Sequence, residues 1–92
     1  MPKFVVRYES AADVASRAPA VFPAHEAWYR RFADDGTLLM IGIFADPQAE
    51  GAMAVFTTRE AAEAFVAGDP FVTEGVVARW HVLEWREVLT GE

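Results

Sequence analysis

The chain has 92 residues, no cysteine and a formal net charge of −6, and 53% of its residues are hydrophobic against 24% charged. This composition excludes a disordered chain, and we expect one folded domain over residues 1–92. The basic residues are few and dispersed, which excludes nucleic acid as a partner, and the lack of cysteine excludes disulfides and cysteine-bound zinc. No stretch reaches the roughly 18 apolar residues that span a bilayer. We expect a cytoplasmic protein.

The N-terminal part predicts a strand followed by an irregular segment. Residues 3–8, KFVVRY, are β-branched and aromatic, which is typical of a short strand. The alanine-rich residues 10–18 suit a loose turn or a brief helix. We expect this segment to stop before Pro19, because proline disfavours a helical conformation in the residue that precedes it.

Residues 20–35 have the periodicity of a first main helix. Pro23 suits the first turn of a helix, where its missing N–H has no partner to lose, and Gly36 suits the position after the last turn. We expect one face of this helix to pack on the core. That face carries His25, Trp28, Tyr29 and Phe32.

Two apolar runs and a second helix follow. Residues 37–44, TLLMIGIF, and 51–57, GAMAVFT, have turn residues between them, which predicts the two strands of a hairpin. Thr57 with Glu60 three residues later has the form of a capping box. It predicts a second helix, which ends at Gly68.

The last part predicts a helical turn and a long strand. Asp69-Pro70-Phe71 begins a single turn that reaches Gly75, and residues 76–86, VVARWHVLEWR, form the closing strand. The predicted order of elements is therefore βαββαβ. This order is the ferredoxin-like α+β fold, in which a four-stranded antiparallel sheet carries both helices on one face.

The predicted sheet is apolar on both faces. Because successive side chains point to opposite faces, strand 37–44 places Leu38, Met40 and Phe44 on one side and Leu39, Ile41 and Ile43 on the other. Helices cover one face only. At roughly 25 cal/mol per Å² of apolar surface, an uncovered face would forgo several kcal/mol. We therefore expect a second copy to cover it, sheet to sheet, in a homodimer or a higher oligomer.

His25 is the first candidate for chemistry, because an imidazole can accept and donate a proton near neutral pH. On the apolar helix face it is expected to turn inward, where it needs a hydrogen-bonding partner. The alternative is a core histidine that binds a backbone carbonyl.

Asp69 is the second candidate. Between Gly68 and Pro70 it can cap the next helical turn, which is the structural interpretation. The predicted fold also brings the N-terminal part of the first helix and the turn after the second helix toward one edge of the sheet. There Asp69 would fix the tautomer of His25 and stabilise its protonated form. No nucleophile accompanies the pair.

The remaining candidates are weaker. Arg17 could bind an anionic group of a substrate, and Trp28 and Phe71 could form pocket walls. His81 lies in the last strand and is interpreted as an interface or surface residue. Two distant histidines without cysteine give no metal-ligand spacing, and the glycines form no phosphate-binding run. We expect neither a metal nor a cofactor.

Several short motifs occur along the chain in one combination. They are Pro23-Ala24-His25, Asp34-Asp35-Gly36-Thr37-Leu38-Leu39 with Gly42, Glu60-Ala61-Ala62, Phe65, Asp69-Pro70-Phe71 and Gly75. The combination resembles the YciI-like (YCII-related) family over essentially the whole chain. The resemblance implies a dimeric α+β barrel of two ferredoxin-like subunits, with His25 and Asp69 as the active pair of a pocket. The substrate-binding candidates are then Arg17, Trp28, Gly42 and Phe71.

The resemblance also implies a class of chemistry. Related barrels include muconolactone isomerases and a YciI-like enzyme that removes chloride from a chlorinated hydroxyhydroquinone. The leading hypothesis is a cofactor-free lyase or isomerase, dehydrochlorinase-like or muconolactone-isomerase-like, acting on a small cyclic or phenolic metabolite. The alternative is a non-catalytic dimer that binds a small ligand or a partner protein, in which His25 and Asp69 only tie helix to loop. Mutation of the pair should lower activity more than stability in the first case.

Overall fold

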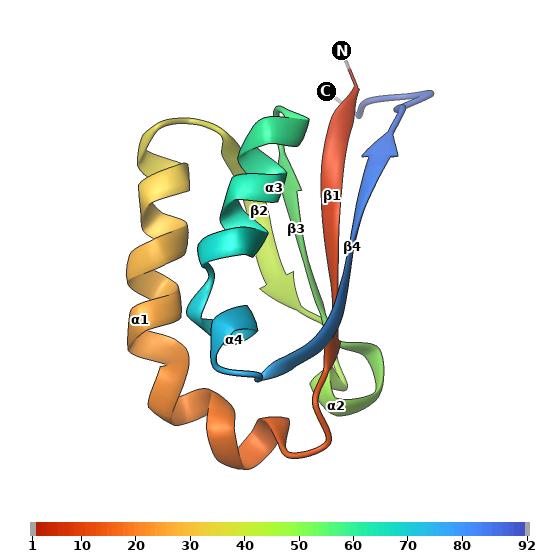
Figure 1. The fold of residues 1–92 in the computed structure, drawn as a ribbon. Coiled ribbons are helices and arrows are strands. Elements are labelled where there is room, and N and C mark those ends of the chain that lie inside the picture. The colour runs from red at the N-terminus through yellow and green to blue at the C-terminus, as the bar shows by residue number, and fades with distance from the viewer. Residues whose placement is uncertain (1, 92) are drawn as a thin grey trace.

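A computed structural model describes residues 2–91 of the chain. Two longer helices, α1 and α3, lie on the same side of a sheet of four strands (Figure 1). The elements in chain order are β1 (Lys3–Ser10), α1 (Val14–Asp34), β2 (Leu38–Ile43), α2 (Pro47–Glu50), β3 (Ala52–Phe56), α3 (Arg59–Gly68), α4 (Pro70–Thr73) and β4 (Val77–Trp85). The predicted βαββαβ order is confirmed, as is the helical turn after Asp69, which is α4, and α2 is a short addition.

The four strands form an antiparallel sheet in the order β2-β3-β1-β4. The first strand is central, so that Val6 faces Ala54 of β3 on one side and Val82 of β4 on the other. Because directly opposed residues share a face, this row marks the side of the sheet that packs against the helices. The predicted ferredoxin-like α+β sheet is confirmed.

The core lies between this side of the sheet and helix α3. Phe56 of β3 and Phe65 of α3 are completely buried, with ring centroids 5.1 Å apart. Ala62 and Val66 are buried on the same face of α3, at the i, i+3 and i+4 spacing of an amphipathic helix. The helix thus fixes the position of the segment that follows Gly68.

Helix α1 is continuous through both of its prolines, so the predicted break before Pro19 is wrong. Pro19 and Pro23 each lack the N–H that would bind the carbonyl four residues earlier. Both prolines are exposed, however, so water can bind the freed carbonyls and the helix continues.

Within residues 2–91 the structure contains no helix that is long and apolar enough to cross a membrane.

The start of helix α3 lies one residue later than the predicted capping box. Thr58, not Thr57, is the N-cap, and its side-chain oxygen accepts a hydrogen bond from the Ala61 backbone N–H at 3.1 Å. The Thr57 N–H instead binds the Thr37 carbonyl at 2.9 Å, which extends the pairing of β2 with β3. Thr57 is therefore held in strand pairing and cannot begin the helix.

Strand β2 contains a bulge that changes its predicted alternation. Leu38 pairs with Phe56 and Met40 pairs with the next residue, Val55, so one extra residue lies in β2 between them. The prediction that Leu38 shares a face with Met40 is therefore wrong. Beyond the bulge, Ile41 and Ile43 turn toward the helices.

The face of the sheet without helices is apolar at its centre, as the sequence predicts. A row of directly opposed residues crosses all four strands and consists of Met40, Val55, Val5 and Leu83. The two central valines are buried by their neighbours, whereas Met40 is 58% and Leu83 50% exposed. Large apolar side chains on both rims of this row therefore contact solvent.

Candidate functional site

Asp69 lies at the junction of α3 and α4 and is completely buried. Its backbone is extended, which ends α3, and Pro70 occupies the first position of α4. The side-chain Oδ1 of Asp69 accepts a hydrogen bond from the Phe71 backbone N–H at 3.0 Å. The capping role predicted for Asp69 is therefore present, and it leaves the carboxylate free to bind other groups.

His25 reaches this carboxylate from helix α1. Its Nδ1 lies 2.7 Å from Asp69 Oδ1, and the histidine is only 7% exposed. The imidazole ring stacks on Phe71, with the centroids 3.9 Å apart and the planes 5° from parallel, and it packs against the ring of Tyr29 at 5.2 Å with the planes 74° apart. These contacts hold the ring in one orientation.

Tyr8 of strand β1 completes the group and was missed in the sequence analysis. Its hydroxyl donates a hydrogen bond to Asp69 Oδ2 at 2.7 Å. Burial, with the negative charge of Asp69 next in importance, raises the pKa of Tyr8 far above its ordinary value. The signal in the sequence was its position two residues after Val6, which places both side chains on the same face of the strand. A tyrosine on the core face needs a partner for its hydroxyl.

The hydrogen bonds determine which nitrogen of His25 carries the proton. A carboxylate only accepts, so Asp69 Oδ1 requires the hydrogen on Nδ1, and the neutral ring then has its lone pair on Nε2. No hydrogen bond within residues 2–91 uses Nε2, and no fully buried side-chain nitrogen or oxygen there lacks a partner. The Nε2 atom is therefore accessible.

A cavity of about 640 Å³ lies against this histidine. One wall is α1, which contributes Val14, Ala15, Ala18, Phe22, His25 and Tyr29. The opposite wall is the helix-facing side of the sheet, where the bulge in β2 has turned Ile41 and Ile43 toward the helices. Phe71 and Gly42, two of the predicted binding residues, also line the cavity.

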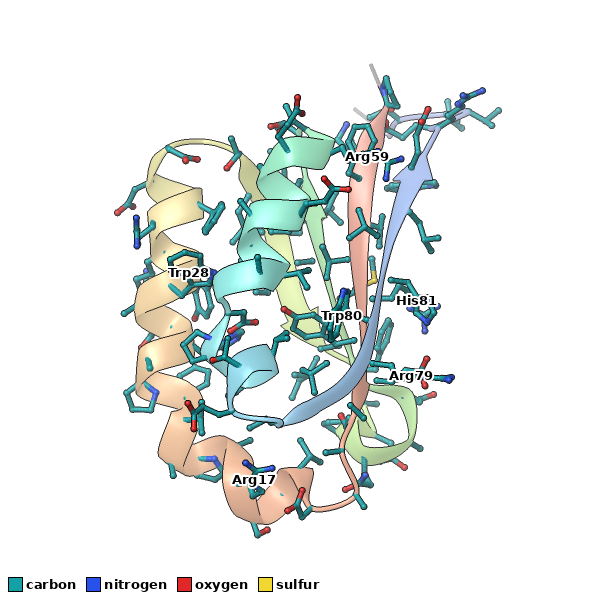
Figure 2. All side chains as sticks on the ribbon, in the orientation of Figure 1. Arg17, Trp28, Arg59, Arg79, Trp80 and His81 are labelled. Carbon is teal, nitrogen blue, oxygen red and sulfur yellow. The ribbon has the colours of Figure 1, made fainter. Side chains whose placement is uncertain are left out.

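The other two predicted binding residues do not line the cavity. The Arg17 guanidinium donates to the backbone carbonyls of Glu74 and Gly75, at 3.0 Å for the latter, beside the loop that precedes β4 (Figure 2). Trp28 lies between α1 and α3, where its Nε1–H donates to the Phe65 carbonyl at 2.9 Å (Figure 2). Both side chains hold α1 against its neighbours.

His81 lies on the other side of the sheet. It points away from the helices (Figure 2), and its Nε2 is 3.1 Å from a carboxylate oxygen of Glu9. The hydrogen bond from His81, followed by smaller effects of nearby Arg79, lowers the pKa of Glu9. Among residues 2–91, no three histidine or acidic side chains are close enough to hold a metal ion.

The family model of the YCII-related domain matches residues 1–86. The chain belongs to the YCII-related family. It is 32% identical over 95 residues to the protein YciI of Escherichia coli O6:H1, an alignment that covers 92% of this chain and 97% of the relative. The YciI protein of Shigella flexneri matches with the same identity and coverage. The family resemblance predicted from the motifs is confirmed.

Two solved structures resemble the fold of this YCII-related chain. One is 5-chloro-2-hydroxyhydroquinone dehydrochlorinase (TftG) from Burkholderia phenoliruptrix AC1100, in complex with 2,5-dihydroxybenzoquinone. Its TM-score is 0.67 with 19% identity, and 94% of each chain is covered. The other is MtbAldR, with a TM-score of 0.53, 8% identity and coverage of 99% of this chain and 57% of that one. At these identities the likeness establishes the fold alone.

The arrangement in the YCII-related chain suits proton transfer. His25 presents one free nitrogen to an apolar cavity, and a buried carboxylate holds the other nitrogen. If Nε2 takes up a proton, the positive ring lies beside the negative Asp69, and Tyr8 keeps the second carboxylate oxygen bonded. This is the relation of base and orienting acid known from catalytic triads.

Tyr8→Phe should make the protein less stable at neutral pH and should remove part of its sensitivity to alkali. At neutral pH the variant leaves Asp69 Oδ2 without a donor, which costs about 1–3 kcal/mol. The raised pKa of Tyr8 means that above pH of about 10 the unfolded wild type ionises while the folded form keeps its proton. Wild-type stability therefore falls from there upward, and the difference from Tyr8→Phe shrinks.

Urea denaturation of both proteins from pH 7 to pH 11 measures this difference. Tyr29→Phe is the matched control, because it removes a partly exposed hydroxyl and should keep the alkaline slope of the wild type. A difference between wild type and Tyr8→Phe that stays constant to pH 11 would show that the Tyr8 hydroxyl is not buried against Asp69.

Proposed function

We propose that this chain is a cofactor-free lyase or isomerase that acts on a small cyclic or phenolic metabolite. His25 is the proton shuttle and Asp69 is the residue that orients it. The observation that carries the proposal is the free Nε2 of His25 at an apolar cavity, with Nδ1 held at 2.7 Å from a completely buried carboxylate. A histidine that served only the core would not need a free nitrogen at a cavity.

The proposed reaction begins when His25 Nε2 takes a proton from a carbon or hydroxyl group of the substrate ring. In an isomerase the proton returns to a different atom of the same molecule. In a lyase the electron pair left behind expels a leaving group, and His25 releases its proton to solvent. Asp69 stabilises the protonated ring without taking the proton itself. General-base catalysis of this kind contributes about two to four orders of magnitude in rate.

Two features support a ring as the substrate. Phe22, Tyr29 and Phe71 surround His25 with aromatic surface, on which a planar ring can pack. The dehydrochlorinase TftG, whose fold is similar, is named for its action on a chlorinated hydroxyhydroquinone and was solved with a dihydroxybenzoquinone. Loss of hydrogen chloride from such a ring is a lyase reaction that needs a base.

A ligand screen followed by turnover tests the proposal. Phenols, hydroquinones, lactones and small acids are screened by thermal shift, and each compound that raises the melting temperature is incubated with wild type and with His25→Asn. At least one ring compound should be converted by the wild type and not by the variant. Binding without turnover would favour the alternative, a non-catalytic dimer that binds a small ligand.

We also propose that the protein is a homodimer in which two helix-free sheet faces pack together. Met40, Val55, Val5 and Leu83 provide a continuous apolar row on that face, and the resemblance to the YCII-related family implies a dimeric α+β barrel. The reducing cytoplasm is the proposed compartment, because the sequence contains no cysteine.

Leu83→Glu should convert the dimer to a monomer, because it places a charge within the apolar row of the proposed interface. Sedimentation or light scattering at micromolar concentration measures the change in mass. Ile43→Glu is the control, since Ile43 is more exposed than Leu83 but faces the helix side of the sheet. A wild-type protein with the mass of one chain would contradict the proposal.

A further inference from the structure

The cavity is longer than a single ring requires. Its residues on α1 run from Val14 through Ala18, Phe22 and His25 to Tyr29, at the spacing of one helix face. At 1.5 Å per residue this stretch is about 22 Å long. A closed protein cavity that holds benzene measures about 150 Å³, whereas this one, which opens to solvent, measures about 640 Å³. A substrate of one ring would leave much of this apolar surface in contact with water.

The two ends of the cavity differ in their lining. Near His25 the walls are aromatic, since the rings of Phe22, Tyr29 and Phe71 have centroids within 5.9 Å of the imidazole centroid. Toward the start of α1 the walls are mainly small or aliphatic, with Ala15, Ala18, Pro19, Ile41, Ile43 and Pro47. The polar residues Ser10 and Gln48 also line the cavity, but their side chains donate to the backbone carbonyls of Pro47 and Ala11. The outer part therefore suits an alkyl or alicyclic group.

The charge of the cavity excludes an anionic ligand. No lysine or arginine lines the cavity among the residues that the structure describes, and the acidic side chain in its lining is Asp46, which caps α2. Arg17, the nearest candidate by sequence, is bound to backbone carbonyls. A carboxylate or phosphate would lose its hydration without gaining a cation, in a chain whose net charge is −6.

We infer that the cavity binds an uncharged compound that is longer than one ring, with a ring at His25 and an apolar extension along α1 toward Val14. This ligand class rests on the proposed function, because it places a ring beside His25. The substrate class of the site is then a neutral ring compound with an alkyl or alicyclic substituent. The ligand of TftG, by comparison, is a single substituted ring.

Three probes with the same ring test the inference, namely phenol, 4-pentylphenol and 5-(4-hydroxyphenyl)pentanoate. Dissociation constants are measured by NMR titration and calorimetry with the wild-type protein. Each methylene buried in the outer part should tighten binding roughly fourfold, so 4-pentylphenol should bind at least 30-fold tighter than phenol. The carboxylate probe should bind at least tenfold more weakly than 4-pentylphenol.

The variant Ala18→Phe tests where the apolar extension of the ligand binds. The new side chain fills the outer part, so the variant should bind phenol within about twofold of wild type and lose the gain from the pentyl group. Ala20→Phe is the matched control on the same helix, because Ala20 is exposed and does not line the cavity. Ala20→Phe should keep the full gain in affinity from the pentyl group.

Several results would overturn the inference. They are the absence of binding by any probe, equal dissociation constants for phenol and 4-pentylphenol, a carboxylate probe that binds as tightly as 4-pentylphenol, or an Ala18→Phe protein that keeps the gain. None of these measurements depends on turnover. Chain-length-dependent binding without any reaction would refute the proposed catalysis and leave the ligand class standing.

Discussion

His25→Asn is expected to lower turnover of a substrate by about two to four orders of magnitude, with a much smaller effect on stability. The amide of asparagine keeps an N–H donor near the position of Nδ1, so Asp69 retains a partner there. What the variant loses is Nε2, the atom that faces the cavity. The change therefore removes the proposed base while it leaves the buried carboxylate bonded.

The measurement is kcat and kcat/KM for any ring compound found to react. If His25 acts in the transition state only, both constants should fall by the same factor and KM should stay close to its wild-type value. His81→Asn is the matched control, because the same substitution on the opposite side of the sheet leaves the cavity intact. Turnover by His25→Asn within a factor of about three of wild type would rule out His25 as the base.

Asp69→Ala is expected to destabilise the fold by about 3–5 kcal/mol, the largest effect on stability that we predict. The carboxylate accepts hydrogen bonds from the Tyr8 hydroxyl, the His25 Nδ1–H and the Phe71 N–H, and alanine would leave all three donors buried without a partner. For a chain of this length the loss corresponds to a fall in melting temperature of about 12 °C or more.

Urea denaturation of Asp69→Ala and of Asp34→Ala measures this loss. Asp34→Ala removes the same charge from an exposed position at the end of α1 and should change stability by less than about 0.5 kcal/mol. If the two variants were equally stable, the buried hydrogen bonds of Asp69 to Tyr8, His25 and Phe71 would not contribute to the folded state.

Asp69→Asn separates the orienting role from the structural one. Asparagine can keep Oδ1 on the Phe71 N–H and the His25 Nδ1–H, and the Tyr8 hydroxyl can turn to accept from the new amide. Most of the hydrogen bonds are therefore conserved, but the negative charge beside a protonated His25 is lost. Activity should fall by a larger factor than stability, whereas a purely structural pair would show loss of stability alone.

The local patterns of the sequence predicted an element well where its residue types favour one secondary structure. The β-branched and aromatic residues of 3–8 and 76–86 predicted β1 and β4, because such side chains pack well on a pleated sheet. Proline at position 19 misled the prediction, because the steric bias against a helical conformation before proline is a preference that packing can outweigh. Pro19 is an exposed residue of α1, and how α1 packs on the sheet is decided by the tertiary structure.

The bulge in β2 could not be predicted either, because it depends on how β2 pairs with another strand. Residues 37–44 are apolar almost throughout, so no polar residue marks an extra position, and the bulge between Leu38 and Met40 appears only in their pairing with β3. Its consequence is functional, because it turns Ile41 and Ile43 toward the helices and into the wall of the cavity.

The sequence by itself determined the order of the elements, the apolar character of both sheet faces and, through a set of short motifs, the family. It also singled out His25 and Asp69 as residues whose chemistry needs a partner. Only the tertiary structure decided that they meet, that Tyr8 joins them and that Arg17 and Trp28 lie outside the cavity. The partners are 44 and 61 positions apart in the chain, and hydrogen bonds over such separations follow from the packing of whole elements and not from any local pattern.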